Sequence, residues 1–236
     1  MKTIGLLGGM SWESTALYYR HINEAVRERL GGLHSARIAL VSVDFARIEA
    51  LQRSNDWDRA GELLAADAQA VEAAGADLLL LCTNTMHRCA DAVAGAIRIP
   101  FLHLADATAD AILARGVTRA GLLGTRFTME QAFYRERLEA RGIEVIVPHA
   151  AEREAVHRIV FDELCLGRVS ETSRARMLEI MDGLRERGAA GVIEGCTEIA
   201  MLVDARHTDI PLFDTTALHA DAAVDAALAG EKDRAD

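Results

Sequence analysis

The chain has 236 residues, half of them hydrophobic and only 5% aromatic, so its core must be built mainly from aliphatic side chains. This length suits one large domain or two domains of about 100–120 residues each. The formal net charge of −10, with no basic stripe along the chain, argues against binding to nucleic acid or to an anionic membrane surface.

The sequence also argues against a membrane-spanning protein and against a secreted one. No apolar run approaches the ~20 residues needed to cross a bilayer. The short apolar run Ile4–Met10 lacks the length and the cleavage site of a signal peptide. The four cysteines contain no CxxC pair, which predicts neither a zinc site nor a disulfide framework. We therefore expect a cytoplasmic protein with free thiols and no bound metal.

The first half of the chain alternates short apolar runs with segments compatible with helix. A strand at 3–7 ends in the glycine-rich turn 8–11, and Ser11 is expected to cap a helix that runs to Leu30. Residues 45–55 are interpreted as irregular. The remaining expected elements are strands at 37–43, 77–81 and 100–104 and an alanine-rich helix at 58–74.

The second half shows the same alternation. The expected strands lie at 120–123, 143–147, 191–194 and 211–213, and the expected helices at 129–141, 152–166, 170–187 and 216–229. Alternation of strands and helices at this spacing predicts parallel sheets built from right-handed crossovers.

Three landmarks recur in the same order in the two halves. They are Gly5-Leu-Leu-Gly with Gly121-Leu-Leu-Gly, Leu81-Cys-Thr with Gly195-Cys-Thr, and Arg98-Ile-Pro-Phe-Leu with Asp209-Ile-Pro-Leu-Phe. We infer two similar α/β lobes that arose by duplication, residues 1–104 with 211–236 and residues 105–210. The alternative is a single sheet with accidental internal similarity. In the two-lobe interpretation, the polar turns at the strand ends are expected to face each other across a cleft.

The turn Gly8-Gly9-Met10-Ser11 stands between a predicted strand and a predicted helix, where backbone N–H groups can hold an anion. It matches neither the dinucleotide pattern GxGxxG nor a phosphate-binding P-loop. A small carboxylate is therefore the favoured ligand, with Met10 and Ser11 as contacts. Alternatively, the glycines merely permit a tight turn.

Cys196 is the candidate nucleophile or base. It follows a predicted strand, and a helix that starts after it would lower the pKa of its thiol and supply thiolate at neutral pH. Its counterpart in the first half is either Cys82 or Thr83, and the pattern alone does not choose between them. Cys89 and Cys165 lie within helix-like segments and are interpreted as packing residues.

Four motifs resemble the aspartate/glutamate racemase family: Gly5-Leu-Leu-Gly-Gly-Met-Ser-Trp-Glu-Ser-Thr, Thr83-Asn-Thr-Met-His, Leu123-Gly-Thr-Arg-Phe-Thr-Met and Gly195-Cys-Thr-Glu-Ile. The resemblance extends to Asp214-Thr-Thr-Ala-Leu-His and is strongest to bacterial racemases that are specific for L-aspartate/glutamate or have broad specificity. It implies two α/β lobes with the active site between them, a homodimer, and neither pyridoxal phosphate nor a metal.

In that family, two cysteines act on opposite faces of the substrate's α-carbon, one removing the α-proton and the other returning a proton. The first of these cysteines directly precedes Asn-Thr, and here that position is Thr83. Cys82 stands one residue earlier, and its side chain is expected to point to the other face of the sheet. The resemblance therefore implies an asymmetric enzyme in which Cys196 deprotonates the substrate, Thr83 donates or relays a proton, and the L-enantiomer is preferred.

The same resemblance implies the substrate contacts. Asn84, Thr85 and Thr197, with the glycine turn, could hold the carboxylate next to the carbanion. Arg53, Gln52, Thr125 and Thr128 are candidates for the side-chain carboxylate of aspartate or glutamate. Leu166 stands where aspartate racemases often have a lysine, so the preferred amino acid stays open. His87 is expected to serve packing or capping.

Two alternatives are retained. Relatives with one catalytic cysteine include decarboxylases of disubstituted malonates, which need only one acid, and two-cysteine relatives include maleate isomerases and hydantoin racemases. The alternative of a different class is a non-catalytic protein whose lobes close on an amino acid.

Overall fold

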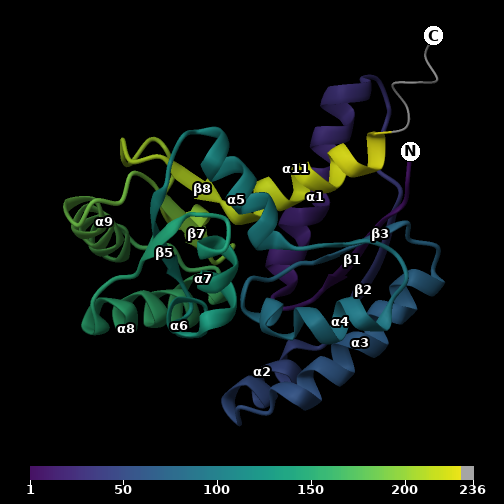
Figure 1. Ribbon diagram of the computed structural model, residues 1–236, viewed down its shortest axis with the longest axis horizontal. Helices are drawn as coiled ribbons and strands as arrows, with labels where there is room; N and C mark the ends of the chain where they lie inside the picture. The colour runs from purple at the N-terminus through teal and green to yellow at the C-terminus, as the bar shows by residue number, and fades with distance from the viewer. Residues whose placement is uncertain (230–236) are drawn as a thin grey trace. The chain divides into compact units, whose positions relative to one another are not determined.

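The computed structural model describes residues 1–229, which form two compact units (Figure 1). The first comprises Met1–Leu104 together with the chain from His219 onward, and the second comprises Ala105–Leu218. Each unit contains one four-stranded parallel sheet, in the order β2-β1-β3-β4 and β6-β5-β7-β8 respectively. The predicted pair of α/β lobes with parallel sheets is therefore confirmed.

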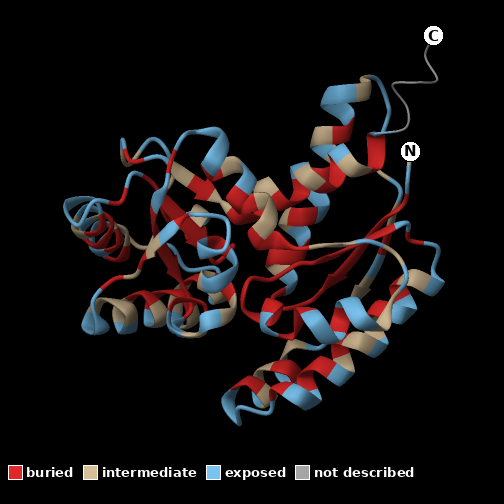
Figure 2. Ribbon diagram, viewed as in Figure 1, coloured by how far each residue is buried: buried red, intermediate tan, exposed pale blue. Residues whose placement is uncertain are grey.

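The sheet of the first unit is covered by amphipathic helices. Its strands are β1 (Ile4–Gly8), β2 (Ile38–Ser42), β3 (Leu78–Leu81) and β4 (Phe101–Leu102). Its helices are α1 (Trp12–Leu30), α2 (Phe45–Arg53), α3 (Trp57–Ala73), the 3-10 helix η1 (Thr85–Cys89), α4 (Ala90–Ala96) and most of α11 (Thr215–Leu228). Buried residues of α1 and α11 pack on β1 and β3, as the continuous buried core of this unit shows (Figure 2).

The second unit repeats the arrangement. Its strands are β5 (Arg119–Gly124), β6 (Glu144–Ile146), β7 (Val192–Gly195) and β8 (Leu212–Asp214). Its helices are α5 (Leu104–Ala114), α6 (Arg126–Glu130), α7 (Ala132–Glu139), α8 (Ala150–Arg158), α9 (Glu171–Glu186) and α10 (Ile199–Leu202). A π-helical turn (Ile159–Glu163) and a 3-10 turn (Leu164–Leu166) extend α8.

The chain returns to the first unit later than expected. The sequence predicts that residues from 211 onward belong to the first lobe, but β8 pairs in parallel with β7 and so completes the second sheet. The C-terminal helix then contributes Ala220 and Val224 to the core of the first unit. The difference arises because the apolar run before this helix has a strand partner that only the folded sheet reveals.

Three local expectations differ from the structure. Residues 45–53 are helical rather than irregular, because the Asp44 carboxylate accepts a hydrogen bond from the Ala46 N–H and caps α2. Helix α5 was not expected. The single helix expected at 129–141 is divided into α6 and α7 at Gln131, whose backbone is extended. None of the helices in residues 1–229 combines the length and the hydropathy that a bilayer span requires.

Candidate active site

In the first unit, the glycine turn and the Thr83 segment lie at the same edge of the sheet. Strands β1 and β3 are parallel and in register, with Leu7 opposite Leu81, so their carboxyl ends coincide. The Ser14 hydroxyl, in the first turn of α1, donates a hydrogen bond to the Cys82 carbonyl at 3.1 Å. The first unit therefore brings together two of the segments that the sequence singled out.

The glycine turn is held by its own side chains. Ser11 caps α1 by accepting a hydrogen bond from the Ser14 N–H at 3.2 Å. Gly9 has a φ of 91°, and a Cβ there would collide with the backbone of Val43. The Gly9 N–H donates to the Thr15 hydroxyl at 2.7 Å and is not available to an anion. This corrects the expectation that the whole turn offers its N–H groups to a ligand. Met10 and Ser11 are both buried.

Thr83, Asn84 and Thr85 are all buried, directly after β3. His87 supports this segment from the following helical turn. Its Nε2 accepts a hydrogen bond from the Leu104 N–H at 3.2 Å, so its Nδ1 carries the proton and donates to the Thr83 carbonyl at 2.7 Å. The imidazole is thus held as a neutral tautomer by two backbone groups. The structure agrees with the capping role expected for His87.

Cys82 packs in the hydrophobic core of the first unit with residues such as Leu6 and Tyr18. It is completely buried, and this burial raises the pKa of its thiol far above its ordinary value. Cys82 is therefore an inert packing residue, in agreement with the expected change of face between neighbouring positions.

Gln52 and Arg53 end helix α2 but differ in environment. Gln52 is buried, and its Nε2 lies 2.9 Å from the Met86 sulfur. The Arg53 side chain is 78% exposed and forms an ion pair with Glu49 one turn earlier, with Nε 3.0 Å from the carboxylate. Arg53, which is expected to bind the side-chain carboxylate of the substrate, is thus paired in the structure with a carboxylate of its own helix.

In the second unit, β5 and β7 end side by side at two glycines, Gly124 and Gly195, which are paired in register. A Cβ on either residue would come within 2.7 Å of a backbone oxygen of the other strand. Thr125 follows and caps α6, with its hydroxyl 3.2 Å from that of Thr128. Both threonines are buried. The close approach of the strand ends therefore brings the threonine pair and the Cys196 turn to one edge.

Cys196 is hydrogen-bonded to a carboxylate. Its Sγ donates to Glu198 Oε2 at 2.9 Å, and the Thr197 hydroxyl donates to the same oxygen at 2.6 Å. Burial, and then the Glu198 charge, hold the pKa of the Cys196 thiol well above its ordinary value. The sequence predicted a lowered pKa, and that prediction is wrong for this structure. Helix α10 has only four residues, and a buried anion stands in front of the sulfur.

Glu194 lies at the end of β7, two residues before Cys196. It is buried, and its Oε1 accepts no hydrogen bond within residues 1–229. Burial, and then the charges of Asp214 and Asp204, raise the pKa of Glu194 to about 8. Asp214 is its partner on the neighbouring strand β8.

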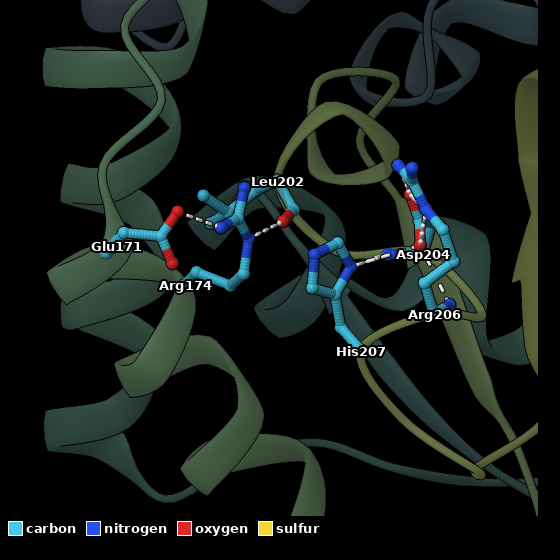
Figure 3. A network of polar contacts seen from close by, with 6 residues as sticks. All are labelled: Glu171, Arg174, Leu202, Asp204, Arg206 and His207. Atoms are coloured by element: carbon cyan, nitrogen blue, oxygen red, sulfur yellow. Dashed lines mark hydrogen bonds and ion pairs between the residues drawn. The ribbon is translucent and has the colours of Figure 1, made fainter.

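A network of polar contacts fixes the segment after the Cys196 turn (Figure 3). Arg174 of α9 donates from Nε to the Leu202 carbonyl at 2.7 Å and pairs with Glu171. Asp204 then binds Arg206 and His207, with Arg206 Nη2 at 2.6 Å. The hydrogen bonds from Arg206 keep the pKa of Asp204 far below its usual range, so this carboxylate stays charged close to Glu194.

The strand registers show which positions of the two sheets are equivalent. The motif Gly-Leu-Leu-Gly occupies Gly5–Gly8 in β1 and Gly121–Gly124 in β5, which are the equivalent strands of the two sheets. Strand β1 places Leu7 opposite Leu81, and strand β5 places Leu123, the equivalent of Leu7, opposite Glu194. Leu81 and Glu194 are therefore equivalent positions.

Counting onward from these positions, Cys82 is equivalent to Gly195 and Thr83 is equivalent to Cys196. The sequence left open whether Cys82 or Thr83 is the counterpart of Cys196, because aligning the two Cys-Thr pairs favours Cys82. The sheet registers resolve the question in favour of Thr83. A hydroxyl in the first unit thus stands where the second unit has a thiol.

Sequence reasoning missed two carboxylates, Glu198 and Glu194. A signal was available for each of them. Glu198 follows the Cys-Thr pair within a single turn, and Glu194 is the only charged residue in the apolar run that leads to Cys196. Their effect on the thiol depends on burial, however, and burial is a property of the fold.

Comparisons with known proteins identify the family of the chain. The profile of the Asp/Glu/hydantoin racemase family matches residues 7–223. The broad specificity amino-acid racemase RacX of Bacillus subtilis is 24% identical over 235 residues, which cover 96% of this chain and 98% of the relative.

Two solved structures are similar over almost their full lengths. A Yersinia pestis protein provisionally assigned as an Asp/Glu racemase is 55% identical, with a TM-score of 0.91 over 97% of this chain and 100% of that one. The aspartate racemase homologue PH1733 from Pyrococcus horikoshii is 33% identical, with a TM-score of 0.85 over 96% of this chain and 99% of that one. The chain is an isomerase that acts on amino acids, and it belongs to the Asp/Glu/hydantoin racemase family.

Proposed function

We propose that this racemase interconverts the enantiomers of aspartate- or glutamate-type amino acids by direct proton transfer at the α-carbon, without pyridoxal phosphate. The observation that carries the proposal is the equivalence of Thr83 and Cys196 in the registers of the two sheets. Inversion at carbon needs one proton acceptor and one proton donor on opposite faces of a planar carbanion. Two similar sheets with a thiol or a hydroxyl at each of two equivalent positions support one acceptor role and one donor role.

Cys196 is assigned to deprotonation, with Glu198 as its proton partner. In the resting protein the sulfur is a thiol, because burial and the neighbouring carboxylate raise the pKa of Cys196. The S–H group already points at Glu198 Oε2. As the S–H bond breaks, an O–H bond forms on Glu198, and the thiolate then removes the α-proton of the L-enantiomer. The electron pair of the Cα–H bond stays on the substrate as a carbanion.

Thr83 is assigned to the return of a proton to the opposite face, directly or through water. As the new Cα–H bond forms, the O–H bond of Thr83 or of the relaying water breaks. The oxyanion then regains a proton from solvent while Glu198 releases the one it took, which resets the site. A threonine hydroxyl can donate, but it is a very weak base at neutral pH. Starting from the D-enantiomer, it would have to remove the α-proton itself. The difference between a thiol and a hydroxyl is therefore the physical reason for the proposed preference for L-substrates.

Buried polar groups near each strand end are assigned to the substrate carboxylates. Asn84, Thr85 and Thr197, with Met10 and Ser11, are proposed to hold the α-carboxylate, whose charge increases as the carbanion forms. Gln52, Arg53, Thr125 and Thr128 are proposed for the side-chain carboxylate. Arg53 would have to exchange its bond to Glu49 for one to the substrate.

The active assembly is proposed to be a homodimer in the cytoplasm. The family resemblance supports the dimer. The four free cysteines, Cys82, Cys89, Cys165 and Cys196, support a reducing compartment.

Exchange of the α-hydrogen in heavy water tests this function directly. The protein is incubated with a panel of L- and D-amino acids, and deuterium at the α-carbon and enantiomer ratios are followed by mass spectrometry and chiral chromatography. We expect exchange and racemisation with L-aspartate or L-glutamate at rates that aminooxyacetate, a scavenger of pyridoxal phosphate, leaves unchanged.

Two other results would contradict the proposal. Release of carbon dioxide from an arylmalonate without α-exchange in any amino acid would identify a decarboxylase. Tight binding of an acidic amino acid without exchange would identify a binding protein.

A further inference from the structure

Among the described residues, one face of β2 is only partly covered by a helix: Ile38 packs against the core that includes α1, whereas Leu40 on the same face is exposed. Within the first unit, the residues that cover the sheet on the side of α1 come from α1 and α11, and they pack on β1 and β3. Strand β2 is one of the two edge strands of this sheet. Its residue Leu40 is 44% exposed. A groove of about 670 Å³ lies between this strand and one side of α1.

The wall of the groove is a stripe along α1 that includes Trp12, Ala16, Tyr19, Asn23 and Arg27. These residues are three or four positions apart and therefore share one face of the helix. Trp12 is 67% exposed and Tyr19 is 54% exposed. Large exposed aromatic side chains gathered along one groove are typical of protein interfaces.

Leu33 adds a second apolar feature to this side of the unit. It lies in the turn between α1 and β2, next to His34, which lines the groove, and its side chain is fully exposed. Two glycines with positive φ, Gly31 and Gly32, form the turn that presents it. A leucine displayed in this way gains nothing within its own chain, whereas its burial against a partner would remove apolar surface from water and favour association.

The charges of the groove include both signs. Arg20, Glu24 and Arg27 line it, and none of the three has an ion pair with another residue in the described range 1–229. Arg29, at the end of the same helix, by contrast pairs with Asp225 at 2.6 Å. A surface that meets itself across a two-fold axis must carry its own complement, so a positive and a negative charge side by side fit a second copy of the same chain.

We propose that this groove, defined by the α1 stripe, Leu33 and Leu40, is the surface through which two copies of the chain form the homodimer. The proposal specifies the dimer included in the proposed function and does not depend on the proton chemistry. The two α1 helices lie antiparallel across the two-fold axis. The partner is a second copy rather than another protein because one antiparallel register satisfies the charges and the apolar side chains together.

That register has its midpoint near Ile22. Residues equally far from the midpoint on two antiparallel helices stand opposite each other, because each residue advances the helix by about 1.5 Å. Arg20 then faces Glu24 of the second copy, and the same pair forms again on the other side of the axis. Leu33, at the far end, reaches the level of Trp12 of the second copy.

The test reverses the charge at one of the two facing positions, 20 or 24. Arg20→Glu and Glu24→Arg are made separately, and the masses of both variants and of the wild type are measured by analytical ultracentrifugation over a range of concentrations. We expect a wild-type dimer and a dissociation constant at least about 100-fold higher for each single variant, because like charges then face each other. An equimolar mixture of the two variants should form a heterodimer with nearly the wild-type dissociation constant.

Arg98→Glu is the matched control, since Arg98 is exposed, lies in the same unit and lines no part of the groove; it should leave the dimer unchanged. A wild type that stays monomeric would overturn the proposal, and so would a dimer that both single variants leave intact. Failure of the single variants to recombine would also overturn it. Because the readout is mass, none of these results depends on whether the protein racemises amino acids.

Discussion

The two units share a sheet order and a register but differ at the one position where the proposed chemistry occurs. At the end of β3 stands Thr83, whose carbonyl is held by a neutral histidine, and at the end of β7 stands Cys196, whose thiol is held by a carboxylate. The two similar sheets therefore supply two equivalent positions, and in the proposed mechanism the side chains at and around them decide which one acts as the base. This difference predicts that the α-hydrogen of the L-enantiomer exchanges with solvent faster than that of the D-enantiomer.

The strongest test of this comparison removes the thiol. Cys196→Ala should reduce both α-deuterium exchange and racemisation of the L-substrate about 10³- to 10⁴-fold, because the proposed general base is lost. Cys89→Ala, which removes a buried thiol from the other unit, should leave both rates unchanged. Substantial exchange in the Cys196 variant would show that another group removes the proton.

Making the two positions alike should remove the asymmetry. Thr83→Cys supplies a thiol at the equivalent position, and we expect turnover of the D-enantiomer to rise about 100-fold, because a thiol is a far better base than a hydroxyl. Thr83→Val should have a different effect, with racemisation lost while exchange of the L-substrate through Cys196 continues. Unchanged turnover of D-substrates in the cysteine variant would contradict the assignment of Thr83.

Glu198 has an uncharged residue, Thr85, at the equivalent position of the first unit. Glu198→Gln keeps the shape but cannot take a proton, so kcat should fall about 10- to 100-fold with little change in KM. Removing the charge should also lower the pKa of the Cys196 thiol, which remains raised by burial. The pH dependence of alkylation by iodoacetamide measures this pKa, and an unshifted profile would exclude a role for the carboxylate.

Glu194 has an apolar counterpart, Leu81, in the first unit. The pKa of Glu194 is raised from its ordinary value of 4.5 to about 8. As the pH rises from 4.5 to about 8, Glu194 loses its proton in the unfolded chain but keeps it in the folded protein. The free energy of unfolding therefore falls progressively over this range. Glu194→Gln should therefore gain about 3–4 kcal/mol over the wild type between pH 5 and pH 8.

Urea denaturation of the Glu194 variant and the wild type at both pH values measures this difference. Asp91→Asn, a change at an exposed carboxylate of the first unit, is the control, and its stability should follow that of the wild type at both pH values. Equal stabilities of Glu194→Gln and wild type across the window would mean that the native state accommodates the charge.

The smallest expected effect concerns Arg53. Its exposed ion pair with Glu49 stabilises the protein by no more than about 1 kcal/mol, so it can be exchanged for a substrate carboxylate. Arg53→Ala should raise KM about 10-fold with kcat nearly unchanged, in keeping with the loss of one exposed charge contact. Glu49→Ala, which frees the same arginine, should not raise KM. An unaltered KM in Arg53→Ala would remove this residue from the substrate site.

The sequence by itself determined most of the architecture. Short apolar runs that end in glycine or small polar residues located the strands, and their recurrence established the duplication. These features are local or periodic and need no knowledge of distant contacts. The same local patterns selected the turns that contain Thr83 and Cys196, and the motifs around them indicated the family.

Only the tertiary structure decided the properties that depend on neighbours from distant parts of the chain. The equivalence of Thr83 with Cys196 follows from pairing between strands, and β8 belongs to the second unit for the same reason. The pKa of Cys196 moves in the direction opposite to the expected one because burial and a carboxylate outweigh a four-residue helix. Desolvation depends on what surrounds a group, and the sequence around a cysteine does not reveal what will be packed against it.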